Sequence, residues 1–500
     1  MLGNRNMSDL GEQTPYAHQS EYTETYGLDR SHILIWQPRT GKTRATLYGT
    51  LRLILEKGVR RILIVGQQTG CDSVWRPECR VLADKIEDLI VVDLYSGKVE
   101  ERINTVKGLD NLTKSLPNSV QMLIVNRDVL FKLSKHLIKW KPQLLIIDEL
   151  QDYIKPGSVR SRAAFSIANV TPYKRGLTGT PIRTNFGNVY GQWKIIAPTV
   201  FGTNKNVFDS KYLIWNKNVK FPKLTGYTNL NELKEKAFSV ASVKLRSECF
   251  DVPDEIPVIR EVVIPTHARQ IYDKIVHDHV LELQLSIDNN IRIPLAHTLT
   301  RMQQLRQVTI GYSRFNEEDT FDLVVNPVTW LHDAKLDSVE ADAEEILDAD
   351  EKLVIFHAFL PEGDEIAKRL SRYKPIILRG GISPQERSKR IESFNNSPKR
   401  EVIIVQEQVG SASISLAGAD NTIFLSCGLD HVIHSQARGR IFKPKRETDH
   451  KLTYGYVWVG NSVDMYVKQL LSGKQSLENY FMDTKNVVST FQQIAYWAGD

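Results

Sequence analysis

Short runs of consecutive apolar residues alternate with longer stretches of helical spacing over the first part of the chain. The apolar runs fall at 33–36, 62–65, 90–92, 122–125 and 144–147, and a further short run of strand type, with only Leu177 strongly apolar, stands at 175–178. Continuous apolar runs of this length are typical of strands buried on both faces, and their alternation with helices is typical of parallel sheets. The pattern therefore predicts a doubly wound α/β lobe from about residue 33 to 184.

The same alternation returns later in the chain. Apolar runs at 353–356, 375–378, 402–405, 422–425 and 454–459 predict a second parallel sheet. Between the two regions, residues 186–250 mix aromatics, lysines and prolines, which indicates an insertion packed on the first lobe. Residues 266–314 have helical spacing and predict a helical projection. We expect an α/β protein of two lobes, each a parallel doubly wound sheet, with a helical insertion between their core motifs.

The changes in sequence pattern along the chain also predict domain boundaries. The first lobe spans 1–250 and includes the insertion at 186–250. A helical insertion or linker of the second lobe covers 251–335. The second lobe itself spans 336–475, and 476–500 form a C-terminal extension.

A candidate phosphate-binding loop follows the first apolar run. Gly41, Lys42 and Thr43 stand between the run at 33–36 and a stretch of helical spacing. In a strand, loop and helix of this kind, backbone N–H groups hold the β- and γ-phosphates of ATP, the lysine neutralises them and the threonine hydroxyl binds Mg²⁺. The alternative is a chance tripeptide. The loop departs from the usual pattern, because Trp36 and Arg39 replace small residues.

Two adjacent carboxylates follow the run at 144–147. Carboxyl ends of parallel strands are where open α/β sheets collect ligands. Asp148 would hold Mg²⁺ through water, and Glu149 would orient and deprotonate the attacking water. A solvated turn is the alternative for this patch taken alone, and the phosphate loop roughly 100 residues upstream weighs against it.

Composition narrows the class of protein. Of 500 residues, 41% are apolar, which is enough for two or three domains with full cores. The net charge of +6 agrees with a polyanion bound in one groove but does not establish it. No apolar run approaches the ~18 residues of a membrane helix, so we expect a soluble cytoplasmic protein without a membrane partner. Paired short spacings typical of zinc sites are absent from the four cysteines, Cys71, Cys79, Cys249 and Cys427.

Four patches in a fixed order carry a family resemblance: 40–43, 148–149, 178–181 and 436–440. The chain resembles the superfamily-2 helicase-type ATPases, and most of all the SWI/SNF-type translocases of double-stranded DNA. The resemblance implies that the two lobes are RecA-like. Residues 15–19 are similar to the family's adenine-reading element, in which Gln19 would hydrogen-bond the base. The resemblance further implies phosphate contacts from Thr40 and Gly41. It assigns the coupling of the ATP site to the DNA groove to Thr178, Gly179 and Thr180.

Other segments resemble the family's DNA contacts. The stretch 62–75 is similar to the strand and turn that touch one DNA strand, with Thr69 in the turn and Trp75 at the family's tryptophan position. Asn126 and Arg127 resemble the next backbone contact. Residues 299–307, with 378–382 and its Gly380, favour this family over the DEAD-box RNA helicases, in which Asp-Glu-Ala-Asp would stand at 148–151.

The second-lobe motifs depart most from the family pattern. Ser411 and Ser413 replace glycines in a loop expected to contact DNA phosphates. Gln436 and Arg440 resemble the last motif, with Gln436 at the nucleotide and Arg440 as the finger on the γ-phosphate. Lys443 stands where a second arginine is usual and would supply a less directional cation.

The resemblance implies an ATP-dependent, Mg²⁺-dependent DNA translocase, and no protein partner is evident. Two alternatives stay open: a strand-separating or fork-remodelling helicase, and a degenerate scaffold that binds DNA or protein without hydrolysis. The bare motor suggests a bacterial or phage protein, in the latter case in the host cytoplasm. Replication, recombination or repair are the processes we expect.

Overall fold

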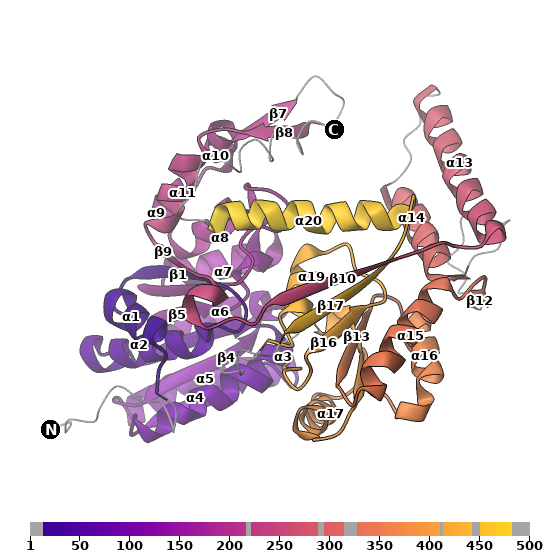
Figure 1. The fold of residues 1–500 in the computed structure, drawn as a ribbon. Coiled ribbons are helices and arrows are strands. Elements are labelled where there is room, and N and C mark those ends of the chain that lie inside the picture. The colour runs from indigo at the N-terminus through magenta and orange to yellow at the C-terminus, as the bar shows by residue number, and fades with distance from the viewer. Residues whose placement is uncertain are drawn as a thin grey trace. The chain divides into compact units, whose positions relative to one another are not determined.

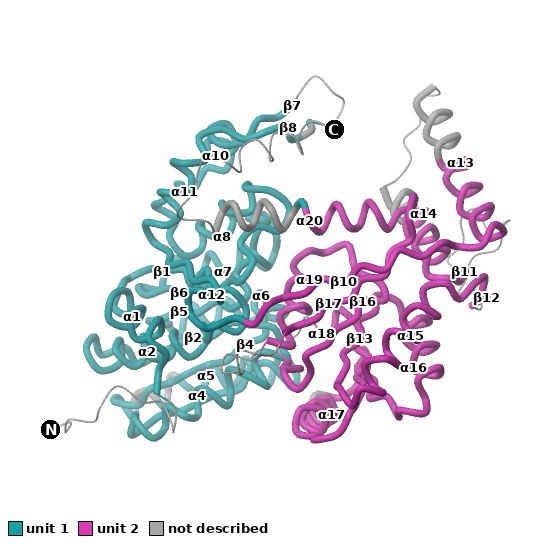
Figure 2. The backbone as a smooth tube through the Cα atoms, in the orientation of Figure 1, with its two compact units in different colours: residues 1–252, 473–500 teal, residues 253–472 magenta. Residues whose placement is uncertain are grey.

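The computed structural model describes residues 14–216, 222–288, 295–314, 328–410, 414–442 and 451–482. The chain divides into two compact units (Figure 2). Unit 1 contains residues 1–252 and 473–500, and unit 2 contains residues 253–472. Each unit is built around its own parallel sheet.

The sheet of unit 1 has seven strands among the described residues, all parallel, in the order β3-β4-β2-β5-β6-β1-β9 (Figure 1). The strands are β1 (Ser31–Trp36), β2 (Arg61–Gly66), β3 (Leu89–Leu94), β4 (Val120–Asn126), β5 (Leu144–Ile147), β6 (Tyr173–Thr178) and β9 (Ala241–Lys244). Six of them are the strands that the apolar runs predict. Neighbouring strands are joined by crossovers, as parallel pairing requires.

Helices cover both faces of this sheet. Residues of β2 alternate between two cores, because successive side chains of a strand point to opposite faces. Leu63 and Val65 pack with α5, α6, α7 and α8, while Ile62 and Ile64 pack with α2 and α4. This confirms the doubly wound lobe. The helices of this part are α1 (Ala17–Tyr26), α2 (Lys42–Lys57), α3 (Gln68–Gly70), α4 (Arg76–Val81), α5 (Val99–Ser115), α6 (Leu130–Trp140), α7 (Val159–Asn169) and α8 (Asn188–Ile196).

The region after α8 is mixed in structure. It contains α9 (Pro198–Phe201), α10 (Lys205–Tyr212), the antiparallel pair β7 (Leu213–Asn216) and β8 (Lys223–Tyr227), α11 (Leu230–Phe238) and α12 (Arg246–Cys249). Its aromatic and aliphatic residues, including Phe208 and Leu233, join the same core as α6 and α7. None of the three strands of this region was predicted, and one of them, β9, extends the main sheet beside β1.

The sheet of unit 2 has six parallel strands in its described part, in the order β10-β17-β16-β13-β15-β14. The strands are β10 (Glu255–Val262), β13 (Leu353–His357), β14 (Ile376–Leu378), β15 (Val402–Gln406), β16 (Asn421–Phe424) and β17 (Leu452–Val459). The five predicted runs are strands. The sixth, β10, lies in a region expected to be helical and forms the edge of the sheet.

The helices of unit 2 include the predicted projection. They are α13 (Thr266–Asp288), α14 (Leu295–Ile310), α15 (Ala334–Asp348), α16 (Leu360–Arg369), α17 (Pro384–Asn396), α18 (Glu407–Gly410), α19 (His431–Arg438) and α20 (Val463–Met482), with the short pair β11 (Tyr312–Ser313) and β12 (Thr329–Trp330). Helices α15 and α16 pack on β13, β15 and β16. Helices α13 and α14 share a separate core with the end of β17 and the start of α20.

Candidate functional site

The predicted phosphate loop is a tight turn between β1 and α2. Two of its residues have left-handed backbone angles, Arg39 with φ 73° and Gly41 with φ 79°. The hydroxyl and the N–H of Thr40 both donate to the Gln37 carbonyl, at 2.8 and 3.3 Å. The turn leads directly into α2, which begins at Lys42. Thr40, Gly41, Lys42 and Thr43 are therefore brought together at a helix N-terminus, where anions bind.

Trp36 explains one departure from the usual loop pattern. Its side chain is fully buried at the end of β1 and packs edge-on against His18 and Tyr22. Its indole N–H donates to the Ser242 hydroxyl on β9 at 3.0 Å. Trp36 thus belongs to the core beneath the loop. Trp75, Trp140 and Trp193 are buried as well.

The N-terminal segment is fastened to the phosphate loop. Gln19 donates from its amide nitrogen to the Gly41 carbonyl at 3.1 Å, and its amide oxygen accepts from the Tyr16 N–H at 2.9 Å. His18 bonds the Thr40 carbonyl at 2.8 Å, and burial lowers the pKa of His18. The Gln19 side chain is buried and contacts the loop itself. Its contact with adenine stays a prediction.

Lys42 lies within the loop and near the predicted metal ligand. Its ammonium donates to the Trp36 carbonyl at 2.7 Å and to the Gln37 carbonyl at 3.4 Å. Its charge is close enough to Asp148 to oppose in part the rise in the pKa of that carboxyl that burial causes. A phosphate in the loop would offer Lys42 a stronger, charged acceptor than these carbonyls.

Asp148 stands at the carboxyl end of β5, as predicted. Its two oxygens accept from the Trp75 indole N–H at 2.8 Å and from the Glu149 N–H at 2.9 Å. Burial and the Glu149 charge raise the pKa of Asp148 to about 6. A hydroxyl from Thr43 with this carboxylate suits Mg²⁺, which takes one or two protein oxygens and otherwise water and phosphate. Sequence reasoning placed Trp75 near DNA and missed its bond to Asp148.

Glu149 begins a chain of side-chain hydrogen bonds. Its backbone is left-handed, with φ 53°. The Gln151 amide N–H donates to the Glu149 carboxylate in a very short contact, and the Gln151 amide oxygen accepts from the Thr178 hydroxyl at 2.6 Å. The Thr178 oxygen in turn accepts from the Thr180 N–H at 3.2 Å. The predicted water-activating carboxylate is thus joined to the predicted coupling segment through Gln151.

The coupling segment also packs against the phosphate loop. Gly179 lies so close to it that an added Cβ would stand 3.1 Å from the Pro38 ring and 3.4 Å from the Trp36 carbonyl. Lys42, Glu149 and Thr178 therefore belong to one assembly at the carboxyl ends of β1, β5 and β6.

The predicted DNA contacts of unit 1 lie at the ends of neighbouring strands. Asn126 ends β4 and accepts from the Asp128 N–H at 3.0 Å. Arg127 is ion-paired with Asp152, and burial lowers the pKa of Arg127. Thr69 lies in α3, just beyond β2, which pairs with β4. The three residues therefore lie at the carboxyl ends of two adjacent strands, β2 and β4.

In unit 2, Arg440 follows α19 and hydrogen-bonds two backbone carbonyls that precede α19 in the chain. Its guanidinium donates to the Gly410 carbonyl at 2.9 Å and to the Ile414 carbonyl at 3.4 Å. Gln436 is buried in α19, and the Gly380 N–H after β14 donates to the Gln406 side chain at 3.2 Å. Ser411, Ser413 and Lys443 lie outside the described residues.

Comparison with known families identifies the fold. The SNF2-related domain matches residues 17–311, more than half of the chain. The chain belongs to the SNF2-related family. The helicase conserved C-terminal domain matches residues 339–445 of the same SNF2-related chain. The two matches confirm the predicted resemblance to the superfamily-2 helicase-type ATPases.

Individual relatives are distant. Protein CHROMATIN REMODELING 4 of Arabidopsis thaliana is 23% identical over 523 residues, covering 96% of this SNF2-related chain and 22% of that protein. The bifunctional helicase and thymine dioxygenase JBP2 of Trypanosoma brucei brucei is 24% identical over 170 residues, which cover 33% of this chain and 16% of that protein. The chain spans about a fifth of the length of these curated relatives. The Sulfolobus solfataricus SWI2/SNF2 ATPase core in complex with dsDNA aligns over 97% of this chain and 95% of its own, with 18% identity and a TM-score of 0.42.

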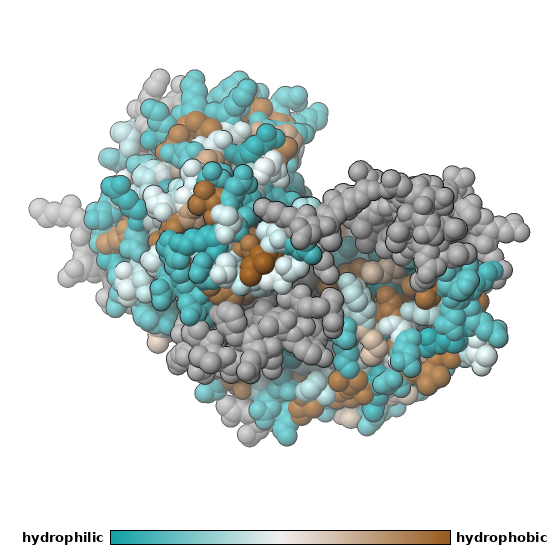
Figure 3. Space-filling model, turned by 90° about the horizontal axis from the view of Figure 1, so that it is seen from above, coloured by the Kyte–Doolittle hydropathy of each residue, from teal (hydrophilic) through white to brown (hydrophobic). Residues whose placement is uncertain are grey.

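On the face shown in Figure 3, apolar residues form small separate patches among polar ones. None of the helices in the described ranges has both the length and the apolar character needed to cross a membrane.

Proposed function

We propose that this SNF2-related chain is an ATP-dependent translocase that moves along duplex DNA. The observation that carries the proposal is the hydrogen-bonded path from Glu149 through Gln151 to Thr178. It gives the residue that would activate water a direct link to the segment expected to respond to DNA. A simple ATP-binding scaffold has no need of such a link.

Each candidate site residue of unit 1 has a task in this scheme. Lys42 and the N–H groups of the loop at 40–43 bind the β- and γ-phosphates. Thr43 and Asp148 would hold Mg²⁺, which would neutralise charge on the phosphates. Glu149 orients a water in line with the γ-phosphate and accepts its proton. Gln151 keeps the Glu149 carboxylate oriented, because its amide is itself fixed by Thr178.

Arg440 completes the scheme from unit 2. In the nucleotide-bound state we propose that the lobes close, so that the Arg440 guanidinium reaches the γ-phosphate while Gln436 and Lys443 contact the nucleotide. An arginine suits this role because its planar fork can bond two phosphate oxygens together. On closure, Arg440 would exchange its carbonyl partners for phosphate oxygens.

DNA would be held through its backbone. Thr69, Asn126 and Arg127 of unit 1, with Gly380, Ser411 and Ser413 of unit 2, are the proposed contacts. Phosphate contacts carry no base information, so we expect binding with little sequence preference. Alternating grip by the two units during each ATP cycle would move the protein along the duplex. Replication, recombination or repair are the processes proposed.

The test is steady-state ATP hydrolysis without nucleic acid, with duplex DNA, with single-stranded DNA and with duplex RNA. We expect strong stimulation by duplex DNA that is lost in Lys42→Ala. Stimulation by single strands alone would instead favour a strand-separating helicase. Absence of hydrolysis would leave a binding scaffold. Displacement of a third strand from a DNA triplex, without displacement of a duplex strand, would then distinguish translocation from unwinding.

A further inference from the structure

A turn at residues 426–428, in which Ser426 and Cys427 are buried, lies between β16 and α19, the helix that carries Gln436 and leads to Arg440. Three charged side chains from separate elements bond to this turn. Arg306 of α14 donates to the Cys427 carbonyl at 2.5 Å, and Glu407 of α18 accepts from the Gly428 N–H. Glu362 of α16 accepts from the Ser426 hydroxyl. The turn is therefore hydrogen-bonded to three helices, α14, α16 and α18.

Arg306 is the member of this set that comes from the helical insertion. Its side chain is 5% exposed and lies over the Phe359 ring, with 4.7 Å between the guanidinium carbon and the ring centroid. Burial lowers the pKa of Arg306, and the nearby charges of Glu362 and Asp464 oppose that effect. A buried guanidinium is costly unless its hydrogen bonds are made, so its bond to the turn is a specific constraint on the fold.

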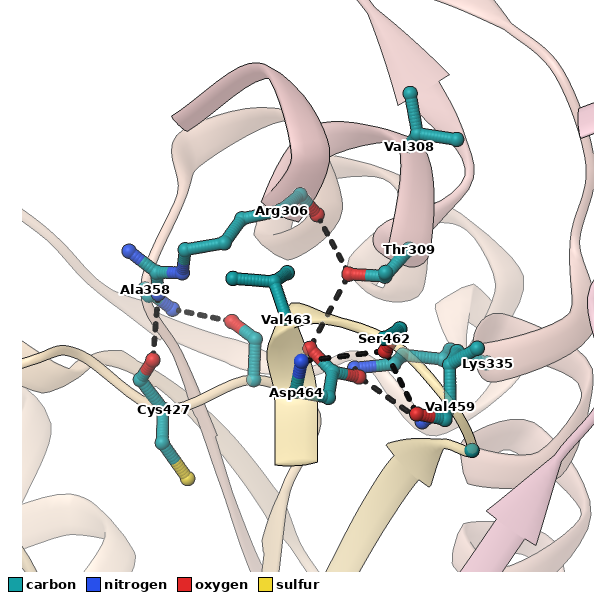
Figure 4. A network of polar contacts seen from close by, with 12 residues as sticks. Arg306, Val308, Thr309, Lys335, Ala358, Cys427, Val459, Ser462, Val463 and Asp464 are labelled. Carbon is teal, nitrogen blue, oxygen red and sulfur yellow. Dashed lines mark hydrogen bonds and ion pairs between the residues drawn. The ribbon is translucent and has the colours of Figure 1, made fainter. Parts of the chain in front are cut away.

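The base of α14 is itself fixed to unit 2 by a second set of bonds (Figure 4). Asp464 accepts from the Thr309 hydroxyl at 3.2 Å and from the Val459 N–H at 3.0 Å. Lys335, which is 1% exposed, pairs with the same carboxylate at 2.6 Å. The Thr309 hydroxyl proton is shared with the Arg306 carbonyl, which lies 2.9 Å from the hydroxyl oxygen. The segment that carries Arg306 thus cannot rotate without breaking buried polar contacts.

On the other side of the turn, Glu407 connects α18 with α19. Besides Gly428, its carboxylate bonds the His434 ring nitrogen Nδ1 at 2.9 Å. Gly428 admits the carboxylate because it lacks a side chain: an added Cβ would stand 2.8 Å from a Glu407 oxygen. Helix α18 ends at Gly410, whose carbonyl accepts from Arg440. The turn, α18 and α19 therefore form one hydrogen-bonded block around Arg440.

We propose that Arg306 is a positioning residue for Arg440. Through the turn at 426–428, it makes the base of the helical insertion and the arginine-bearing segment move as one body. A force or ligand that reorients α14 then changes where Arg440 stands relative to the γ-phosphate. This inference rests on the proposed function, because it takes Arg440 as the arginine that acts on ATP.

The test compares two variants with a matched control. Arg306→Met removes the bond to Cys427, and Arg306→Lys keeps the charge and one donor. The control is Arg269→Met, because Arg269 also reaches from the insertion to carbonyls of unit 2, those of Gly460 and Asn461, but does not touch the turn. The measurements are kcat, the KM for ATP and the midpoint of thermal unfolding, with and without duplex DNA.

The expected result is a drop in kcat of about tenfold or more in Arg306→Met, the size typical of a lost bond to a charged group, with the KM for ATP within about twofold. Arg306→Lys should recover part of kcat. Arg269→Met should leave kcat near that of the unchanged protein. Unaltered kcat in Arg306→Met would overturn the proposal, and so would an equal loss in Arg269→Met.

Two further outcomes are also decisive. If Arg306→Met does not fold, Arg306→Lys carries the test: a folded Lys variant with unaltered kcat would overturn the proposal, and a lowered kcat at constant KM would support it. If the unchanged protein hydrolyses ATP without stimulation by duplex DNA, the proposed translocase function fails. The positioning role is then judged on basal kcat, since Arg440 is required in either case.

Discussion

At the residue scale, Glu149 offers the most direct test of the chemistry. Its carboxylate is held by Gln151 at the end of β5, beside Asp148 and near Lys42. Glu149→Gln keeps an oxygen that can accept from Gln151 but removes the base. We expect ATP hydrolysis to fall by about 10²- to 10⁴-fold, the contribution typical of general base catalysis.

Nucleotide binding in Glu149→Gln should persist, because the phosphate contacts come from the loop at 40–43. Phosphate release measures turnover, and the fluorescence of a labelled ATP analogue measures binding. Undiminished hydrolysis would sink the assignment of the base. Loss of binding together with hydrolysis would show that the substitution disturbed the loop instead.

Gly41 permits a second prediction at this scale. An added Cβ would stand 2.2 Å from the Gln19 amide nitrogen, and φ is +79°. Gly58, which ends α2 with φ +66°, has no described atom within 4 Å of such a Cβ. Both alanine variants incur the left-handed backbone cost of roughly 1–2 kcal/mol. We expect the clash to make Gly41→Ala the less stable of the two and to weaken nucleotide binding in it alone. Chemical denaturation and nucleotide titration of both variants measure the difference.

At the element scale, the ends of β5 and β6 are joined by the Thr178 hydroxyl. Thr178→Val keeps the shape of the side chain and removes its bonds to Gln151 and to the Thr180 N–H. We expect duplex DNA to stimulate hydrolysis at least about tenfold less in this variant, because breaking a buried bond leaves the Gln151 amide unsatisfied. The control is Thr171→Val, a buried threonine that donates to the Ile167 carbonyl at 2.8 Å. Equal stimulation in both variants would contradict the coupling path.

The elements of the two sheets were predictable to very different degrees. Central strands such as β2 and β13 are buried on both faces and read as unbroken apolar runs. The unpredicted strands β9 and β10 lie at sheet edges, and β10 contains Pro257 and exposes Ile259. Edge strands need only one apolar face and tolerate proline, so their sequences give a weak signal.

The candidate site shows the same division. Motif spacing places Asp148 and Thr178 at strand ends and Lys42 between a strand and a helix, as the structure has them. The bonds of Gln151 to Thr178 and of Trp75 to Asp148 join elements that the fold alone brings together. Sequence patterns along one element carry no information about such contacts. Gln19 illustrates this point, since its amide bonds the phosphate loop 22 residues away.

At the scale of the whole molecule, the net charge is only +6 in a protein that we propose binds DNA through its phosphates. Such binding releases counterions, so affinity for duplex DNA should fall steeply with salt and vary little with sequence. Arg127 is the residue whose share can be isolated. Its charge is now neutralised by Asp152, and a DNA phosphate would compete for the same guanidinium.

We expect Arg127→Gln to reduce the slope of log affinity against log salt by about one phosphate contact, uniformly across DNA sequences. The control is Arg52→Gln. Arg52 forms an ion pair with Glu56 on α2. It stands ten residues after Lys42, the first residue of that helix, which is roughly 15 Å along the helix axis. Fluorescence anisotropy over a range of salt concentrations measures both slopes. An unchanged slope in Arg127→Gln would remove this residue from the DNA path and leave its ion pair with Asp152 as a purely structural contact. A sequence-dependent loss would point to base contact and against a translocase that grips only the backbone.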